Sequence, residues 1–137
     1  SLEYIEKSES KVAHHNQNVA GIHLNISLVF KHNKDYEKSI EHLEIARKIF
    51  EECNNIKGLL HCYNSFGNLL IKQKKFQEAE LYFRKSLVLA ENENNDFGVA
   101  VVYNNLSQIY EQKNELETAL NYALKSLKLK KNLNKYD

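Results

Sequence analysis

Tyr103-Asn-Asn-Leu-Ser-Gln-Ile-Tyr110 begins a unit that recurs along this chain, and Leu116-Glu-Thr-Ala119 and Asn121-Tyr-Ala-Leu-Lys-Ser126 continue it. Forty residues earlier, the same pattern of large apolar and small residues holds Tyr63, Phe66, Gly67, Leu70, Phe76, Ala79 and Ser86. A second step of forty reaches His23, Ile26, Ser27, Phe30, Tyr36, Ser39 and Ala46. Three copies at one fixed period are typical of stacked supersecondary units.

The composition favours a folded domain and disfavours several classes of partner. The 137 residues are 42% apolar and carry a net charge of +1, which is far from the strong positive field of a dedicated nucleic-acid binder. No apolar run approaches the roughly 18 residues that span a bilayer, and the charged start does not resemble a signal peptide. We therefore expect a cytoplasmic domain with no membrane association and no direct nucleic-acid contact.

The two cysteines, Cys53 and Cys62, are too few for a disulfide framework or a zinc site, so we interpret both as reduced packing thiols. Their spacing near one turn leaves a disulfide under oxidising conditions as an alternative. The six histidines show no metal-ligand spacing, and no nucleophile elbow or phosphate-binding glycine loop occurs. We expect no metal, no cofactor, no small-molecule substrate and no enzymatic activity.

Apolar periodicity predicts three antiparallel helix pairs. The first helices are predicted at 18–33, 56–73 and 96–113, and the second helices at 36–53, 76–93 and 116–133. Residues 1–17 parallel the second helix of a repeat, so we predict a seventh, orphan helix there and a chain that is a fragment of a longer protein. The prediction is one all-α domain, 1–137, with repeats at 18–57, 58–97 and 98–137.

The second repeat resembles the tetratricopeptide repeat (TPR) through Tyr63, Phe66-Gly67, Leu70, Ala79, Phe83 and Ser86. The chain departs from that family in its period, forty in place of thirty-four, and in carrying Glu51, Glu91 and Lys131 where proline is usual. The resemblance implies a right-handed α-solenoid of about three and a half helical hairpins, whose first helices line a concave groove for peptides. In its forty-residue period the chain resembles the TPR subclass found in peptide-binding scaffolds and in bacterial peptide-responsive regulators.

Side chains one place after the core stripe of each first helix are expected to face that groove. The predicted peptide-binding residues are Lys31, His61, Asn64, Asn68, Lys72, Asn104, Asn105 and Gln108. Carboxamides both donate and accept, so a row of them can pair with the backbone of an extended peptide, and the lysines can attract a carboxylate. The alternative is that these amides only solvate an exposed helix face. Leu24 and Leu28 stand where a carboxylate clamp for chaperone tails needs polar residues, so we expect no such ligand.

The ends of the chain carry more leucine than one neighbouring hairpin can cover. We therefore predict homo-oligomers in which Leu124, Leu127 and Leu133 of one copy pack near Leu2 and Ile5 of another. The predicted function is a protein- or peptide-binding module. Two alternatives are the sensor and dimerisation domain of a bacterial signalling or transcriptional regulator, and a structural spacer.

Overall fold

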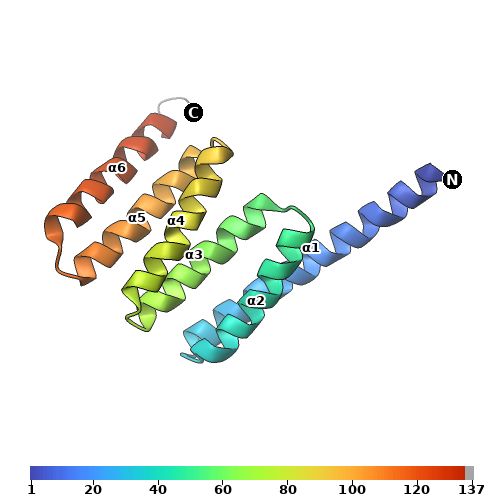
Figure 1. The fold of residues 1–137 in the computed structure, drawn as a ribbon, viewed down its shortest axis with the longest axis horizontal. Helices are drawn as coiled ribbons and strands as arrows, with labels where there is room; N and C mark the ends of the chain where they lie inside the picture. Colours follow the sequence, from blue (N-terminus) through green and yellow to red (C-terminus); the bar gives the residue numbers. More distant parts are fainter. Residues whose placement is uncertain (135–137) are drawn as a thin grey trace. The chain divides into compact units, whose positions relative to one another are not determined.

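A computed structural model describes residues 1–134 of the chain, and these residues form six α-helices without a strand (Figure 1). The helices are α1 Leu2–His32, α2 Tyr36–Glu52, α3 Ile56–Lys72, α4 Phe76–Asn92, α5 Asp96–Gln112 and α6 Leu116–Asn134. The chain divides within α3 into two compact units, residues 1–62 and the part that begins at Tyr63. The predicted third repeat extends to Asp137, and its residues 135–137 lie outside the described part.

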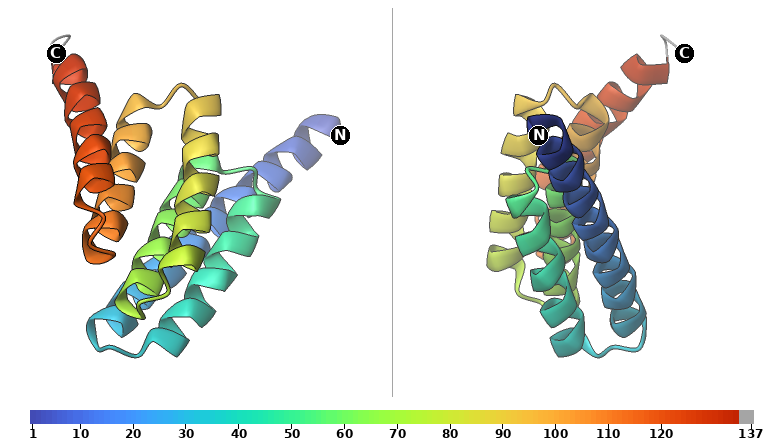
Figure 2. Two further views of the ribbon diagram at one scale, coloured as in Figure 1. Left: turned by 60° about the vertical axis from the view of Figure 1, so that its left-hand side comes forward. Right: turned by 90° about the vertical axis from the view of Figure 1, so that its right-hand side faces the viewer.

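The prediction of seven helices is wrong, because residues 2–32 form one continuous helix. The chain turns after each of the helices α1 to α5 at a residue with positive φ, namely Lys34, Asn54, Lys74, Asn94 and Asn114. These turns recur every twenty residues. The place twenty residues before Lys34 is His14, which is helical. No left-handed residue interrupts the backbone there, so the helix continues, and its N-terminal part extends past the end of α2 (Figures 1 and 2).

The five turns share one geometry, which makes sequential helices antiparallel. In the turn after α3, Lys75 N donates to Leu70 O at 2.8 Å and Lys74 N donates to Ile71 O at 2.9 Å. This pair of bonds satisfies two carbonyl groups at the helix end. It requires a left-handed backbone at one residue of the turn, which here is Lys74. Two of the following helices are capped by asparagine, since Gly58 N and Gly98 N each donate to an asparagine Oδ1 at 2.9 Å, on Asn55 and Asn95 respectively.

In the first unit, α1 and α2 pack against each other through small buried residues and a pair of rings. Ser39 Oγ donates to Ser27 O at 2.8 Å, and the two serine hydroxyls lie 2.9 Å apart. The rings of His23 and His42 stack at 5.2 Å, with their Nδ1 atoms 2.9 Å apart. The serines allow the helices to approach, and the rings fill the space beside them.

In the second unit, the core joins three helices. Its buried residues are Leu70 and Ile71 of α3, Ala79 and Phe83 of α4, and Val102, Leu106 and Ile109 of α5. The helix α6 packs antiparallel to α5 (Figure 2), and Ser107 Oγ donates to Ala119 O at 2.8 Å between them. Tyrosine pairs at 63 and 82 and at 103 and 122 repeat the ring contact of His23 and His42.

At Gly67, the backbone of α3 lies very close to a side chain of α4. A Cβ atom at this position would lie 2.5 Å from the Phe83 ring, whose side chain is fully buried. Glycine costs about 1 kcal/mol relative to alanine inside a helix, so its presence here is explained by the space that the aromatic ring occupies.

Replacement of Gly67 by alanine is expected to lower the free energy of unfolding by about 1–3 kcal/mol, because the Phe83 ring must shift to admit a methyl group. Gly21→Ala is the matched control. Its Cβ would meet no atom within 4 Å, so helix propensity alone should raise stability by up to about 1 kcal/mol. Urea unfolding followed by circular dichroism measures both changes, and equal effects of the two substitutions would contradict this packing.

Candidate protein-interaction surface

The helix α5 presents one face that its neighbours leave uncovered. Phe97, Val101, Asn104 and Gln108 follow one another at intervals of four, three and four residues, which is the spacing of one helix face. Phe97 and Asn104 are seven residues apart, so they lie within about 20° around the helix axis and about 10 Å along it. Phe97 is 61% exposed, Asn104 and Gln108 are exposed, and Val101 is half-buried. The face combines an aromatic anchor with two carboxamides, and we refer to these four residues as the α5 face.

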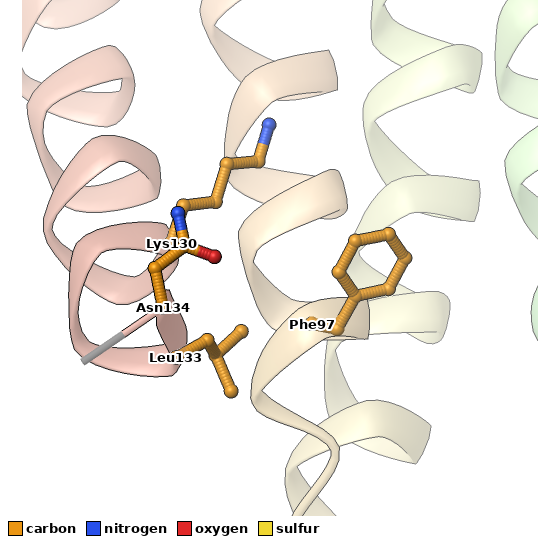
Figure 3. Close-up of a pocket in the computed structure, with 4 residues that line it drawn as sticks. All are labelled: Phe97, Lys130, Leu133 and Asn134. Carbon is orange, nitrogen blue, oxygen red and sulfur yellow. The ribbon is translucent and has the colours of Figure 1, made fainter. Parts of the chain in front are cut away.

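An open hollow of about 450 Å³ adjoins the N-terminal end of the α5 face. The hollow is lined by Phe97 of α5 and by Lys130, Leu133 and Asn134 of α6, and in the view of Figure 3 the Phe97 ring projects to the side of α5 away from α6. The ring and Leu133 give the hollow apolar walls, while Lys130 contributes an ammonium group and Asn134 a carboxamide. Such a combination suits an apolar side chain next to a carboxylate.

The residues predicted on α3 lie in two kinds of environment. Asn64 and Asn68 are half-buried, and Lys72 is exposed. The Oδ1 atom of Asn64 is buried and accepts no hydrogen bond from the described residues. This oxygen is therefore an acceptor that a donor from a partner or a water molecule can satisfy.

The remaining predicted residues are more scattered. On α5, Asn104 and Gln108 are exposed as expected, but Asn105 is only 8% exposed and offers little surface to a partner. Lys31 is half-buried and His61 exposed, and both belong to the first compact unit, not to the unit that holds the α5 face. The structure thus brings together Asn104, Gln108 and the half-buried amides of α3 in one compact unit.

Sequence reasoning missed Phe97, Lys130 and Asn134. One signal was present: Phe97 stands where the first two repeats have Gln17 and Lys57, so an aromatic residue replaces polar ones at a surface position. Leu133, predicted to mediate self-association, lines the hollow beside Phe97.

The contact of α4 with α5 contains a polar network. Tyr110 Oη donates to Glu80 Oε1 at 2.7 Å, and Arg84 Nη2 donates to the same oxygen at 2.7 Å. Burial raises the pKa of the Glu80 carboxyl, but the hydrogen bonds from Tyr110 and Arg84 outweigh it and leave that pKa below its ordinary value. Through the bond from Tyr110, the Glu80 carboxylate links α4 to α5.

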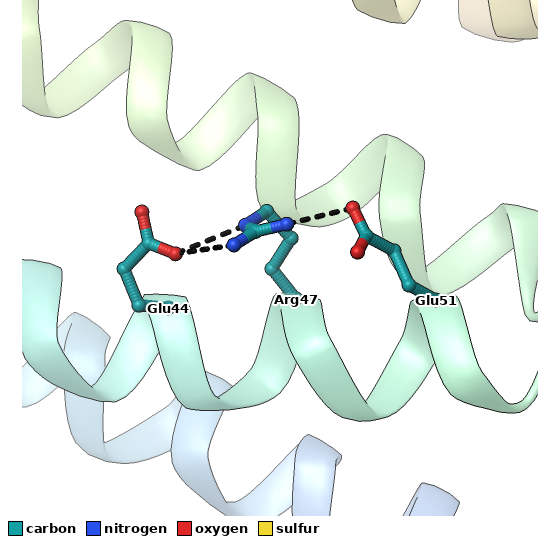
Figure 4. Close-up of polar contacts among 3 residues, drawn as sticks. All are labelled: Glu44, Arg47 and Glu51. Atoms are coloured by element: carbon teal, nitrogen blue, oxygen red, sulfur yellow. Dashed lines mark hydrogen bonds and ion pairs between the residues drawn. The ribbon is translucent and has the colours of Figure 1, made fainter.

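A second charged cluster lies on α2, where Arg47 bridges Glu44 and Glu51 (Figure 4). Both ion pairs measure 2.7 Å between nitrogen and oxygen. Pairs of this spacing on a partly exposed helix contribute only a few tenths of a kcal/mol each. In the same unit, burial raises the pKa of the Cys62 thiol to about 12, so this thiol is a packing group.

Residues 1–134 contain no group of three or more His, Cys, Asp or Glu side chains placed to hold a metal ion. Within the same residues, no helix combines the length and the apolar character needed to cross a membrane.

A family model of the tetratricopeptide repeat matches residues 18–92 and 63–132, and together these matches include most of the chain. The chain belongs to the tetratricopeptide repeat family. TPR domains generally mediate protein–protein interactions. The comparison with curated proteins finds no match.

Solved TPR structures share the fold at low sequence identity. The TPR domain of Arabidopsis FLU is 20% identical with a TM-score of 0.74, over 82% of this chain and 94% of that one. The N-terminal domain of stress-induced protein-1 from C. elegans is 19% identical with a TM-score of 0.66, over 83% and 86%. BtubC from P. vanneervenii is 18% identical with a TM-score of 0.75, over 87% of this chain and 49% of BtubC. At these identities the likeness is one of fold.

The network at Glu80 makes part of the stability of this TPR domain dependent on pH. The folded pKa of Glu80 lies below the unfolded value of about 4.3. Its contribution is therefore fully present above the unfolded pKa and disappears as the pH falls through the folded pKa. Glu80→Gln should cost about 1 kcal/mol at pH 7 and progressively less below pH 4.

Urea unfolding of both proteins between pH 7 and pH 3 measures this difference, with the exposed Glu91→Gln as control. A stability difference for Glu80→Gln that is independent of pH would show that the Glu80 carboxylate does not hold this network.

Proposed function

We propose that this TPR domain is a non-catalytic binding module that holds an extended peptide segment of a partner protein along the α5 face. The observation that carries the proposal is Phe97, a ring 61% exposed that lies two helical turns from Asn104 on the same face and borders the hollow lined by Lys130 and Leu133. An exposed aromatic ring beside a second apolar side chain is typical of a binding surface, because apolar side chains are unfavourable in water unless a partner covers them.

The chemistry of the face suggests how a peptide would be held. Asn104 and Gln108, one turn apart, each offer a donor and an acceptor to the peptide backbone without selecting a side chain. The hollow would receive an apolar side chain between Phe97 and Leu133. Lys130 would then pair with an acidic side chain or a terminal carboxylate, which gives the peptide a direction.

The amides of α3 extend this surface within the same compact unit. Asn64 and Asn68 occupy the places on α3 that Asn104 and Gln108 occupy on α5, forty residues later. The buried Oδ1 of Asn64, which accepts no bond from the described residues, supports a polar ligand at this position. A role as the sensor of a bacterial peptide-responsive regulator, and a cytoplasmic location, remain predictions from the sequence.

Peptides selected from a random display library on the 137-residue chain should bind the α5 face. The double substitution Phe97→Ala/Asn104→Ala is expected to weaken their binding at least about tenfold, because it removes an aromatic anchor and a backbone-pairing amide. The matched control Leu81→Ala/Asn92→Ala removes an apolar and an amide side chain from exposed positions of α4 and should change affinity by less than about twofold.

Fluorescence polarisation with labelled peptides measures both changes, and repeating it with amidated peptides and with Lys130→Ala tests the terminal carboxylate. Unchanged affinity for the Phe97→Ala/Asn104→Ala variant would place the site elsewhere. Failure to select any peptide would overturn peptide binding as the function.

A further inference from the structure

The helix α6 has an exposed stripe of four leucines. Leu116, Leu120, Leu124 and Leu127 are between 48% and 62% exposed. They are separated by four, four and three residues, so they lie within about 80° of the helix circumference. A continuous apolar stripe of this kind marks an interaction surface in a folded protein.

The repeat register shows what packs on the equivalent stripe one repeat earlier. Forty residues before the leucines, α4 has Phe76, Glu80, Arg84 and Leu87. Phe76 and Leu87 pack against the core cluster to which α5 contributes Val102, Leu106 and Ile109, and Glu80 accepts the hydrogen bond of Tyr110. The stripe on α6 is therefore the surface on which, one repeat earlier, a first helix lies.

The helix α1 has the opposite half of this contact. Eighty residues before Val102, Leu106 and Ile109, which are fully buried on α5, α1 has Ile22, Ile26 and Val29. Ile22 is 57% exposed and Val29 is 59% exposed. The face that α5 buries against the preceding second helix is thus left open on α1.

The hydrogen-bonded pair of Glu80 and Tyr110 between α4 and α5 has apolar counterparts on both α6 and α1. Where α4 has Glu80, α6 has Leu120, and where α5 has Tyr110, α1 has Phe30. Phe30 also keeps the ring position of Tyr110, since it stacks on His42 as Tyr110 stacks on Tyr122. If only one member of the pair had changed, a partly buried carboxylate or hydroxyl would lack its partner. Two apolar replacements make the open surfaces of α6 and α1 complementary to each other.

We propose that α6 of one copy of this chain binds α1 of a second copy, with the packing that α4 and α5 use internally. The association is heterologous, because each copy uses two different surfaces and can bind one neighbour through each. The register moves the contact on α1 from Leu2 and Ile5, predicted from the sequence, to Ile22 and Val29. The surface is separate from the α5 face, so the two proposals stand independently.

Sedimentation velocity of the 137-residue chain over a wide concentration range tests this association. The wild-type mass should rise with concentration beyond that of a dimer. Leu120→Glu removes the α6 surface and Val29→Glu removes the α1 surface, so each variant alone should weaken self-association at least about tenfold. The exposed control Leu81→Glu on α4 should associate like wild type.

Mixing the two variants separates this arrangement from a symmetric one. Leu120→Glu keeps its α1 surface and Val29→Glu keeps its α6 surface, so the mixture should form a one-to-one dimer that grows no further. The double variant Phe30→Tyr/Leu120→Glu should recover association, because it rebuilds the hydrogen-bonded pair of Tyr110 and Glu80 between copies. Leu127→Lys and Ile22→Lys form a second pair if circular dichroism shows that either first variant has lost its helices.

Three results would overturn the proposal. A wild-type chain that stays monomeric at every concentration excludes the association. Undiminished self-association of Val29→Glu would show that α6 binds α6. A mixture of folded variants that remains monomeric would show that the two surfaces do not bind each other.

Discussion

The packing of α3 on α4 depends on the absence of a side chain at Gly67. The Phe83 ring lies 2.5 Å from the place of a Cβ atom at position 67, which leaves no room for a side chain there. Interiors are packed as densely as organic crystals, so such a site cannot admit an extra methyl group without movement. The other repeats solve the same constraint differently, with Ser27 and Leu43 in the first and Ser107 and Ala123 in the third. Glycine is paired with the largest of the three partners, and serine with the two smaller ones.

Beside the small residues at 27, 67 and 107, other contacts between helices recur with the period of forty. The ring pairs at 23 and 42, 63 and 82, and 103 and 122 lie beside the small residues. The hydrogen bond of Tyr110 to Glu80 ties α5 to α4. The functional surfaces follow from this register: the α5 face is the side of a first helix that no neighbour covers, and the α6 stripe is the side that a further first helix would cover.

Much of this fold could be predicted from the sequence, because small and aromatic residues at a fixed period specify which helix faces meet. Five of the six helices both begin and end within one residue of their predicted bounds. The continuous α1 was missed, since the pattern of Leu2 to Ser8 resembles a second helix, while the missing turn at His14 depends on backbone conformation.

The candidate site was harder to predict. A helical period identified Asn104 and Gln108 as exposed, but Asn105 is buried because the neighbouring helices cover that side of α5. The hollow joins Phe97 to residues more than thirty positions later, Lys130, Leu133 and Asn134. That juxtaposition arises from the antiparallel packing of α5 and α6, and no local pattern of residues indicates it.

The close packing of α3 on α4 depends on the pairing of a small residue at 67 with a large ring at 83, and a transplant of the corresponding residues from the first repeat tests this most directly. Urea unfolding of Gly67→Ser, Phe83→Leu and their combination measures the coupling between the two positions. The double variant carries the pair of the first repeat, so we expect it to be at least about 1 kcal/mol more stable than the sum of the single effects implies. Strictly additive effects would contradict the claim, because they would show that the residue at 67 does not sense the size of the side chain at 83.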